Sequence, residues 1–443
     1  MNAVLREAVP PASAWPLDEA ALRDPYPHFH AWREAGPLHW SPHLFGGAWV
    51  LTRHADCEAA LRDERLSAQR TGGWVQRGGG RSLQNDDAAS GSRGEPANQR
   101  AAFQRLFARA LLFVDAPDHT RLRRLMQPAF TPAAVLRLRA GIAAECEALL
   151  SAAEATLKQQ GVCDLIEAVA RPLPARVIGR LLGLPAADGR QCMAWSDDLA
   201  NFLGAAQPDA GQIDRAEAAL VGMVRCFDDL LPARRTTPHD DLLGHLARHH
   251  EAGRFHGALG GRAELLAQCA MLLFAGHETT RHLLGSLLHH LLAEPGRWAR
   301  LRQRHRTDPA CLGAVVREAL RHDSPVHYTG RRVTRDFTLH GQPLRRGDLV
   351  LVLIGAANRD PARYDRPDAF DPGRANSPSL AFGIGTHFCL GAQLTMLEAE
   401  TLLGQMLHRW PEPTLHDLQG DWLASPLYRG LRSLWVKPVA TLT

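Results

Sequence analysis

The sequence lacks the features that mark several large classes of protein. Its eight cysteines stand far apart, and no two have the C-x-x-C spacing of a zinc site or a disulfide-rich scaffold. Charged and polar residues interrupt every apolar window of about 18 residues, the length that a membrane-spanning helix needs. No segment recurs with a period of roughly 20 to 50 residues. These absences exclude a zinc ribbon, a membrane-spanning helix and a repeat architecture.

The chain also lacks a strong charge of one sign and an apolar leader. Lysine and arginine total 51 against 47 aspartate and glutamate, and the net charge of +4 is too small to indicate a nucleic-acid partner. The N-terminal letters MNAVLREAVPPASAW carry early charges and prolines instead of the apolar core of a signal peptide. We therefore expect a cytoplasmic protein with reduced thiols that binds neither nucleic acid nor membrane.

Hydrophobic residues make up 45% and charged residues 22% of the 443 residues, as in an ordinary globular protein. Amphipathic helix patterns fill residues 117–300, and short strands and turns follow residue 323. Residues 71–100 are rich in Gly, Ser, Asn and Arg without periodicity. We interpret them as a mobile loop, since similar helical patterns lie on both sides, although an interdomain linker has the same composition. The expected fold class is α+β, mainly helical with a smaller β region, in a single domain over residues 1–443.

The longest helical pattern runs from Arg262 to Gly296 and is apolar on most faces, which predicts a helix through the interior. Its centre begins like the zinc-peptidase motif H-E-x-x-H with His277 and Glu278, but the next histidine, His282, comes one residue too late. Five residues of helix turn two side chains roughly 140° apart, so these histidines would not bind one zinc ion from one face.

The same centre holds Gly276 and Thr279, residue types that lower helix stability, by up to about 1 kcal/mol for glycine. Gly276 would allow a flat cofactor to approach, and a threonine hydroxyl bonded to the helix backbone would open a groove. Glu278 and Thr279 form an acid–alcohol pair, which is suited to holding and passing protons. A buried polar patch with a tertiary partner is the alternative.

Cys389 lies near the end of a glycine-punctuated loop, FGIGTHFCLG over residues 382–391, directly before the helical pattern AQLTMLEAETLLGQML. A thiolate that binds iron needs an electropositive site, and the N–H groups of a helix N-terminus would lower the pKa of the thiol. The glycines would let the backbone approach a metal and its macrocycle. Phe382 would keep the sulfur dry, and His387 would donate a hydrogen bond to a cofactor carboxylate. A lone cysteine in a tight turn is otherwise most often structural.

The loop FGIGTHFCLG resembles the cysteine-ligand loop of cytochrome P450 enzymes at both loop glycines, the histidine, the cysteine and the following glycine. The helix centre AGHETT is similar to the family's A-G-x-[DE]-T-[TS] motif, and the resemblance extends over nearly the whole chain. It implies the cytochrome P450 fold, with haem b between the long internal helix and the loop. Cys389 would bind the iron, with further cofactor contacts from Ala275, Gly276, Phe382 and Gly391.

Glu318 and Arg321 are spaced as an i,i+3 pair, which by itself is most often a surface pair worth a few tenths of a kcal/mol. The resemblance makes them the family's buried E-x-x-R pair, with Arg374 of ANRDPARYDRPDAFDPGR as the third partner. It also implies a set of residues that bind the haem propionates: His119, Arg123, Arg331 and His387.

By resemblance, substrate contacts come from the loop before Pro117, from residues 201–229, and from a mostly apolar set elsewhere: Leu272, Leu273, Val326, His327 and Leu427. Such a lining favours a largely hydrophobic, medium-sized substrate, either free or bound to a carrier protein. Residues 71–100 lie where the family places a variable loop over the substrate, and they would act as a lid.

The resemblance implies a haem-thiolate monooxygenase, an oxidoreductase that inserts one oxygen atom from dioxygen into its substrate, with Glu278 and Thr279 as catalytic residues. The chain has no G-x-G-x-x-G after a strand, so electrons would come from a ferredoxin and its reductase. Arg121 and Arg124 would help to dock an acidic ferredoxin. We expect a monomer. Two alternatives remain: a peroxide-driven oxygenase usually lacks the acid–alcohol pair, and a haem sensor does not need it.

Overall fold

The computed structural model describes residues 18–42, 45–69, 108–185, 188–205, 208–236, 240–255, 261–374 and 378–437, so the expected loop over residues 71–100 lies outside the described residues. The helices are α1 (Glu19–Arg23), α2 (Tyr26–Ala35), α3 (His54–Arg62), α6 (Asp118–Met126), α7 (Pro132–Arg137), α8 (Arg139–Gln160), α9 (Pro172–Leu181), α10 (Gly189–Gly204), α11 (Ala210–Thr236), α12 (Leu242–Glu251), α13 (Gly261–Ala293), α14 (Arg297–Thr307), α15 (Cys311–His322), α16 (Ile354–Ala357) and α17 (Ala392–Arg409). Shorter helical turns are η4 (Leu111–Phe113), η5 (Gln127–Phe130), η6 (Ile166–Ala170) and η8 (Gly385–His387). The strands are β1 (Leu38–Ser41), β2 (Ala48–Leu51), β3 (Leu66–Ser67), β4 (Cys163–Asp164), β5 (Thr329–Val333), β6 (Phe337–Leu339), β7 (Gln342–Leu344), β8 (Leu349–Val352), β9 (Thr414–Leu415), β10 (Asp421–Trp422), β11 (Leu431–Ser433) and β12 (Trp435–Lys437).

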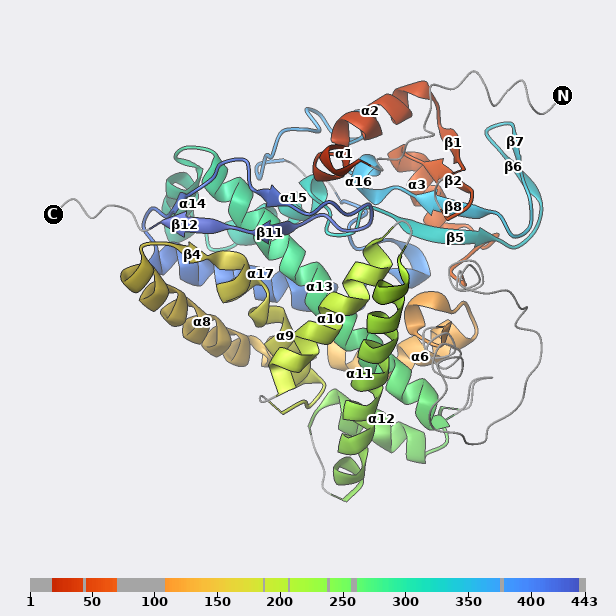
Figure 1. The fold of residues 1–443 in the computed structure, drawn as a ribbon, viewed down its shortest axis with the longest axis horizontal. Coiled ribbons are helices and arrows are strands. Elements are labelled where there is room, and N and C mark those ends of the chain that lie inside the picture. Colours follow the sequence, from red (N-terminus) through yellow and green to blue (C-terminus); the bar gives the residue numbers. More distant parts are fainter. Residues whose placement is uncertain are drawn as a thin grey trace.

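Helix α13 runs through the middle of the helical part of the molecule (Figure 1). Its side chains are buried over most of its length, and α9, α10, α11, α15 and α17 pack against it. A helix that is apolar on most faces is stable only when other elements enclose it in this way. The prediction of an interior helix is therefore confirmed. None of the helices described here is long and apolar enough to cross a membrane.

The largest sheet has the strand order β1-β2-β8-β5-β3 and lies to one side of the helices (Figure 1). Strands β2 and β8 are parallel, and the other pairs of this sheet are antiparallel. Strand β8 is buried at every position, as a central strand covered on both faces must be. Smaller sheets pair β4-β12-β9, β10-β11 and β6-β7. The predicted fold class, mainly helical with a smaller β region, is confirmed.

Glu318 and Arg321 of α15 are both buried, with side chains 4% and 1% exposed, so they are not a surface pair. Arg321 donates hydrogen bonds to both carboxylate oxygens of Glu318, at 2.7 and 2.8 Å. Glu318 also accepts the N–H of Asp371 at 2.8 Å and lies 3.5 Å from Nε of Arg374. Arg321 binds three backbone carbonyls as well, those of Asn358, Pro367 and Ala369. This network holds residues 358–374 against α15.

We predict that Glu318→Gln destabilises the protein by about 3–5 kcal/mol, because two buried guanidinium groups lose their carboxylate. Urea unfolding would measure this loss. The matched control is Glu294→Gln, which breaks the exposed pair of Glu294 with Arg297 and should cost less than about 1 kcal/mol. Equal losses in the two variants would contradict a buried, structure-holding network.

Candidate functional site

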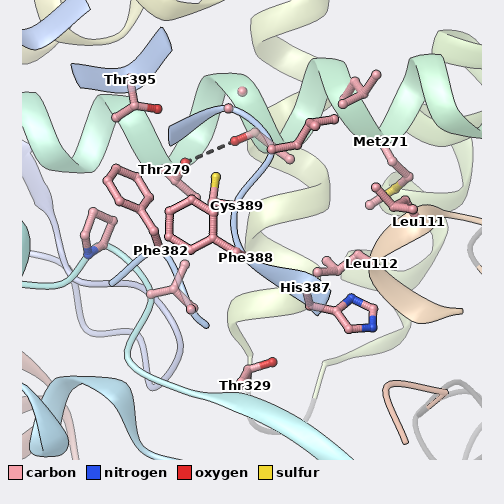
Figure 2. Close-up of a pocket in the computed structure, with 18 of the residues that line it drawn as sticks. Leu111, Leu112, Met271, Thr279, Thr329, Phe382, His387, Phe388, Cys389 and Thr395 are labelled. Carbon is pink, nitrogen blue, oxygen red and sulfur yellow. Dashed lines mark hydrogen bonds between the residues drawn. The ribbon is translucent and has the colours of Figure 1, made fainter. Parts of the chain in front are cut away.

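A cavity of about 370 Å³ lies between α13 and the loop that precedes α17. Figure 2 shows part of its lining, with Thr279 from α13, Phe382 and Cys389 from the loop, and Thr395 from α17. The cavity brings together most of the residues that the motifs and the resemblance predict for the site: His119, Arg123, Leu272, Ala275, Gly276, Thr279, Val326, Arg331, Phe382, His387, Cys389, Gly391 and Leu427.

Two glycines shape the loop around Cys389. Gly383 and Gly385 have φ angles of +67° and +76°, a left-handed conformation that costs glycine nothing but strains other residues. The N–H of Cys389 donates to the carbonyl of Phe382 at 2.8 Å and closes the loop. Helix α17 begins shortly afterwards, so that the N–H groups of Gly391 and Ala392 face the sulfur.

The pKa of the Cys389 thiol is set by opposing effects. Burial raises its pKa, while the N–H of Gly391, the charge of Arg123 and the N–H of Ala392 act in the opposite direction without reversing the shift. The N–H groups at the start of α17 thus lower the pKa of the thiol as expected, but desolvation of the thiolate outweighs them in the protein alone. A cation that binds the sulfur would reverse this balance, since coordination removes the thiol proton.

Two buried groups at the cavity fit the carboxylates of haem. Arg331 is 5% exposed, and among the described residues its guanidinium donates to the carbonyl of Gly330 and the hydroxyl of Thr329, at 2.8 and 3.2 Å. Burial lowers the pKa of Arg331 to about 10. Nε2 of His119 is buried and has no hydrogen-bond partner among the described residues. Because buried charges and polar atoms are costly without partners, both groups are suited to an anionic ligand.

His387 and Arg123 lie at the same part of the cavity. The ring of His387 is 4.1 Å from that of His119, centre to centre, and its Nε2 lies 4.0 Å from a carboxylate oxygen of Asp115. Arg123 is close enough to Cys389 and His119 for its charge to affect the pKa of both. The predicted propionate set is thus gathered in one place.

On α13, Ala275, Gly276 and Thr279 line the cavity. The hydroxyl of Thr279 donates to the carbonyl of Ala275 at 3.1 Å, the backbone bond that was expected to loosen the helix. A Cβ on Gly276 would lie 2.8 Å from a side-chain carbon of Ile178 on α9. The packing of α9 against α13 therefore requires a glycine at position 276, whether or not a cofactor also approaches it.

Glu278 is not among the described residues that line the cavity, although Thr279 is. Adjacent residues of a helix point about 100° apart, so the acid and the alcohol face different sides. Burial would raise the pKa of Glu278, but His282 at 3.0 Å, Arg281 at 3.6 Å and His277 at 4.0 Å lower it to about 2. Glu278 is thus an ionised carboxylate behind the cavity wall, and its catalytic role stays a prediction.

The predicted substrate contacts divide into two groups. Leu272, Val326 and Leu427 line the cavity, whereas Leu273 and His327 are both 1% exposed and lie outside its lining, so the prediction is wrong for these two. Leu273 is next to Leu272 but on another face of α13. His327 lies edge-on to the rings of Tyr26 and Phe29, where burial lowers its pKa to about 3.

Several cavity residues escaped the sequence-based prediction. Met271 lies one turn before Ala275 and two turns before Thr279 on α13, a spacing that would have identified it. Ile178 reaches the cavity from α9 by tertiary packing alone, and no local signal marks it. The two segments predicted only as ranges also contribute residues: Leu111, Leu112, Phe113, Phe202 and Leu203.

Arg121 does not have the free surface that a docking role needs. Its guanidinium binds Glu264 of α13 at 2.6 Å and Asp118 at 2.9 Å, with 19% of the side chain exposed. The expectation for Arg121 is therefore wrong, because this residue ties α6 to α13. Arg124 is exposed on α6.

A cavity that offers a thiol to a metal and buried cations to carboxylates is suited to haem, which places the protein in the haem-thiolate class. The comparisons with known proteins agree. A family model described as Cytochrome P450 matches residues 234–414. Cytochrome P450 107B1 of Saccharopolyspora erythraea is 36% identical over 396 residues, which cover 89% of this chain and 90% of the relative. The chain belongs to the cytochrome P450 family.

Two further similar proteins differ in what they act on. The vitamin D(3) 25-hydroxylase of Pseudonocardia autotrophica is 34% identical over 394 residues, or 89% of this chain and 88% of the relative. The crystal structure of P450BioI with an acyl carrier protein ligated to hexadec-9Z-enoic acid has a TM-score of 0.81 at 27% identity and covers 95% of this chain and all of the other, 100%. The predicted family, the haem cofactor and the enzyme class, a cytochrome P450 monooxygenase, are confirmed.

We predict that Arg331→Leu weakens haem binding by about 2–5 kcal/mol, because a propionate loses a buried cation. Transfer of haem to excess apomyoglobin would measure the faster loss. Arg332→Leu on the same strand is the control, since Arg332 donates to the carbonyl of Gly347 and does not line the cavity. Loss of haem at the same rate in both variants would remove Arg331 from the propionate set.

We predict that His327 makes the protein less stable as the pH falls from about 6.5 toward its folded pKa of about 3. The unfolded histidine takes up a proton near pH 6.5 while the folded one stays neutral, so acid favours unfolding, by about 2 kcal/mol at pH 5. His327→Phe removes this contribution, and its urea-unfolding free energy should fall less between pH 7 and pH 5. An unchanged pH dependence would show that His327 is charged in the folded protein.

Proposed function

We propose that the protein inserts one oxygen atom from dioxygen into an apolar small molecule, by hydroxylation or epoxidation, with electrons from a ferredoxin and its reductase. The observation that carries the proposal is the shared cavity: the thiol of Cys389 and the hydroxyl of Thr279 line it together with largely apolar walls. The reaction consumes two electrons and two protons and releases the second oxygen atom as water. Cys389 would hold the iron, and His119, Arg123, Arg331 and His387 would hold the propionates.

When bound, haem supplies the chemistry that reduces and cleaves dioxygen. The chain supplies the surroundings. Phe382 beside Cys389 would keep water from the sulfur, and Thr279 offers a hydroxyl to the cavity from α13. The Thr279 hydroxyl already donates its hydrogen to the carbonyl of Ala275. An oxygen atom bound in the cavity would therefore compete with that carbonyl for the same hydrogen.

The cavity supports an apolar substrate. Its lining includes Phe113, Phe202, Met271 and Leu272. The amide of Gln268 also lines it, but its Oε1 accepts the N–H of Leu111 at 2.8 Å and its Nε2 donates to the carbonyl of Arg109 at 2.7 Å. Because that amide is already engaged, it adds little polar recognition. The molecules named for the two similar proteins, vitamin D(3) for the hydroxylase and a carrier-linked hexadecenoic acid in the complex with P450BioI, support a bulky hydrophobic substrate, either free or carrier-bound.

The proposal predicts substrate-dependent oxygen uptake when the haem-bound protein is combined with a surrogate ferredoxin, its reductase and a nicotinamide reductant. Apolar candidates are first selected by the change in haem absorption that accompanies displacement of a bound water. Turnover with hydrogen peroxide alone would favour a peroxide-driven oxygenase, and ligand binding without oxygen uptake would favour a sensor. Cys389→Ser should lose both turnover and the red-shifted carbon monoxide absorption of a thiolate complex. Cys311→Ser, at a buried thiol of α15, should keep both.

A further inference from the structure

Gln268 of α13 carries a buried amide that joins this helix to the turn η4. Gln268 is 1% exposed and lines the cavity. Its Oε1 accepts the N–H of Leu111 at 2.8 Å, and its Nε2 donates to the carbonyl of Arg109 at 2.7 Å. Only one orientation of the amide makes both bonds, because a backbone N–H can only donate and a carbonyl can only accept. One side chain therefore fixes two backbone groups of a segment that lies far away in the sequence.

The amide of Gln268 supplies the cap that the start of η4 lacks. This turn begins at Leu111, and the residue before it, Ala110, makes no side-chain hydrogen bond to cap it. The first N–H groups of a helical turn have no acceptor within the turn and need one from elsewhere. Ala110 is fully buried, so the backbone here is shielded from water that could act as the acceptor. The position of η4 therefore depends on a side chain of α13.

The turn η4 forms a thin part of the cavity wall. Leu111, Leu112 and Phe113 all line the cavity, and Figure 2 shows the first two among the lining side chains. Leu112 is also 46% exposed, so at this point a single turn separates the cavity from solvent. Beyond the turn, Asp115 accepts the N–H of Ala68 at 2.9 Å and holds the other end of the segment. The placement of η4 thus decides how much room the cavity has at this wall.

We propose that Gln268 is a positioning residue that holds η4 against the cavity and thereby limits the size of the substrate. The inference rests on the proposed function, in which an apolar substrate shares this cavity with haem. Haem would take up part of the volume of about 370 Å³, so a bulky substrate needs this wall to move outward. The two buried hydrogen bonds of Gln268 oppose that movement. The affinity for a bulky ligand is therefore reduced by the small fraction of molecules whose wall is open, whereas a small ligand needs no such movement.

A first test measures amide hydrogen exchange in residues 109–113 of the haem-bound protein. Gln268→Met keeps the length of the side chain but has no amide, so exchange at Leu111 should rise roughly 10-fold. Gln268→Asn, whose amide is too short to reach both backbone groups, should act in the same direction and replaces Gln268→Met if that variant does not bind haem. Gln405→Met is the matched control, because Gln405 of α17 donates to the carbonyl of Ala143 at 2.9 Å and is not among the described residues that line the cavity. Exchange that does not rise, or that rises equally in the control, overturns the proposal.

A second test compares the affinities of imidazole and clotrimazole, a bulky apolar imidazole, for the haem-bound protein. Both bind iron through the same kind of nitrogen, and the change in haem absorption measures both affinities. Gln268→Met should bind clotrimazole roughly 10-fold more tightly, because the wall opens at lower cost, and should bind imidazole as the wild type does.

A general disturbance of the fold would change both affinities together, so their ratio separates a positioning role from a structural one. An unchanged ratio overturns this inference alone, because neither ligand is turned over. A wild type that binds both ligands but takes up no oxygen with any substrate overturns the proposed function instead, and the limit on ligand size stands.

Discussion

The position of the cysteine loop depends on one buried guanidinium, that of Arg321. Because it is cut off from water, each of its N–H groups must find an acceptor, and these acceptors come from Glu318 and from three carbonyls spread over residues 358–369. One of these residues, Asn358, uses its side-chain oxygen to accept the N–H of Leu380 at 2.8 Å, just before the loop. The loop itself is closed by the bond from Cys389 to Phe382. Hydrogen bonds thus link α15 through Asn358 to Leu380, next to the loop that carries Cys389.

The pKa of each ionisable group near the cavity is set by its burial and by the charges of its neighbours. The neighbours His282, Arg281 and His277 lower the pKa of Glu278, whereas burial raises the pKa of Glu398 well above its usual range. The pKa values of these two acids on α13 and α17 are therefore shifted in opposite directions. Burial lowers the pKa of Arg331, and the charge of Asp115 acts in the opposite direction.

Local spacing predicted much of the site, and rotation of helices about their axes accounts for most of what it missed. The residues 382–391 act through their own backbone, and Glu318 and Arg321 meet because i,i+3 positions share a face, so both features can be inferred from the sequence. Leu273 beside Leu272 and Glu278 beside Thr279 show the limit: a pattern that is apolar on most faces does not reveal which face meets the cavity. Arg121 and Gly276 depend on Glu264 and Ile178, partners that only the tertiary structure brings near.

The burial of the Arg331 cation has a consequence for the folding of the chain. Without cofactor, the folded chain must bury the charge of Arg331 and leave Nε2 of His119 without a hydrogen-bond partner among the described residues, and a bound dicarboxylate would reduce this cost. Haem thereby becomes a folding ligand whose free concentration sets the fraction of native chains. A cell that runs short of haem would lose this protein to its proteases before the remaining molecules lost activity. Abundance, and not only catalysis, is thus linked to iron supply.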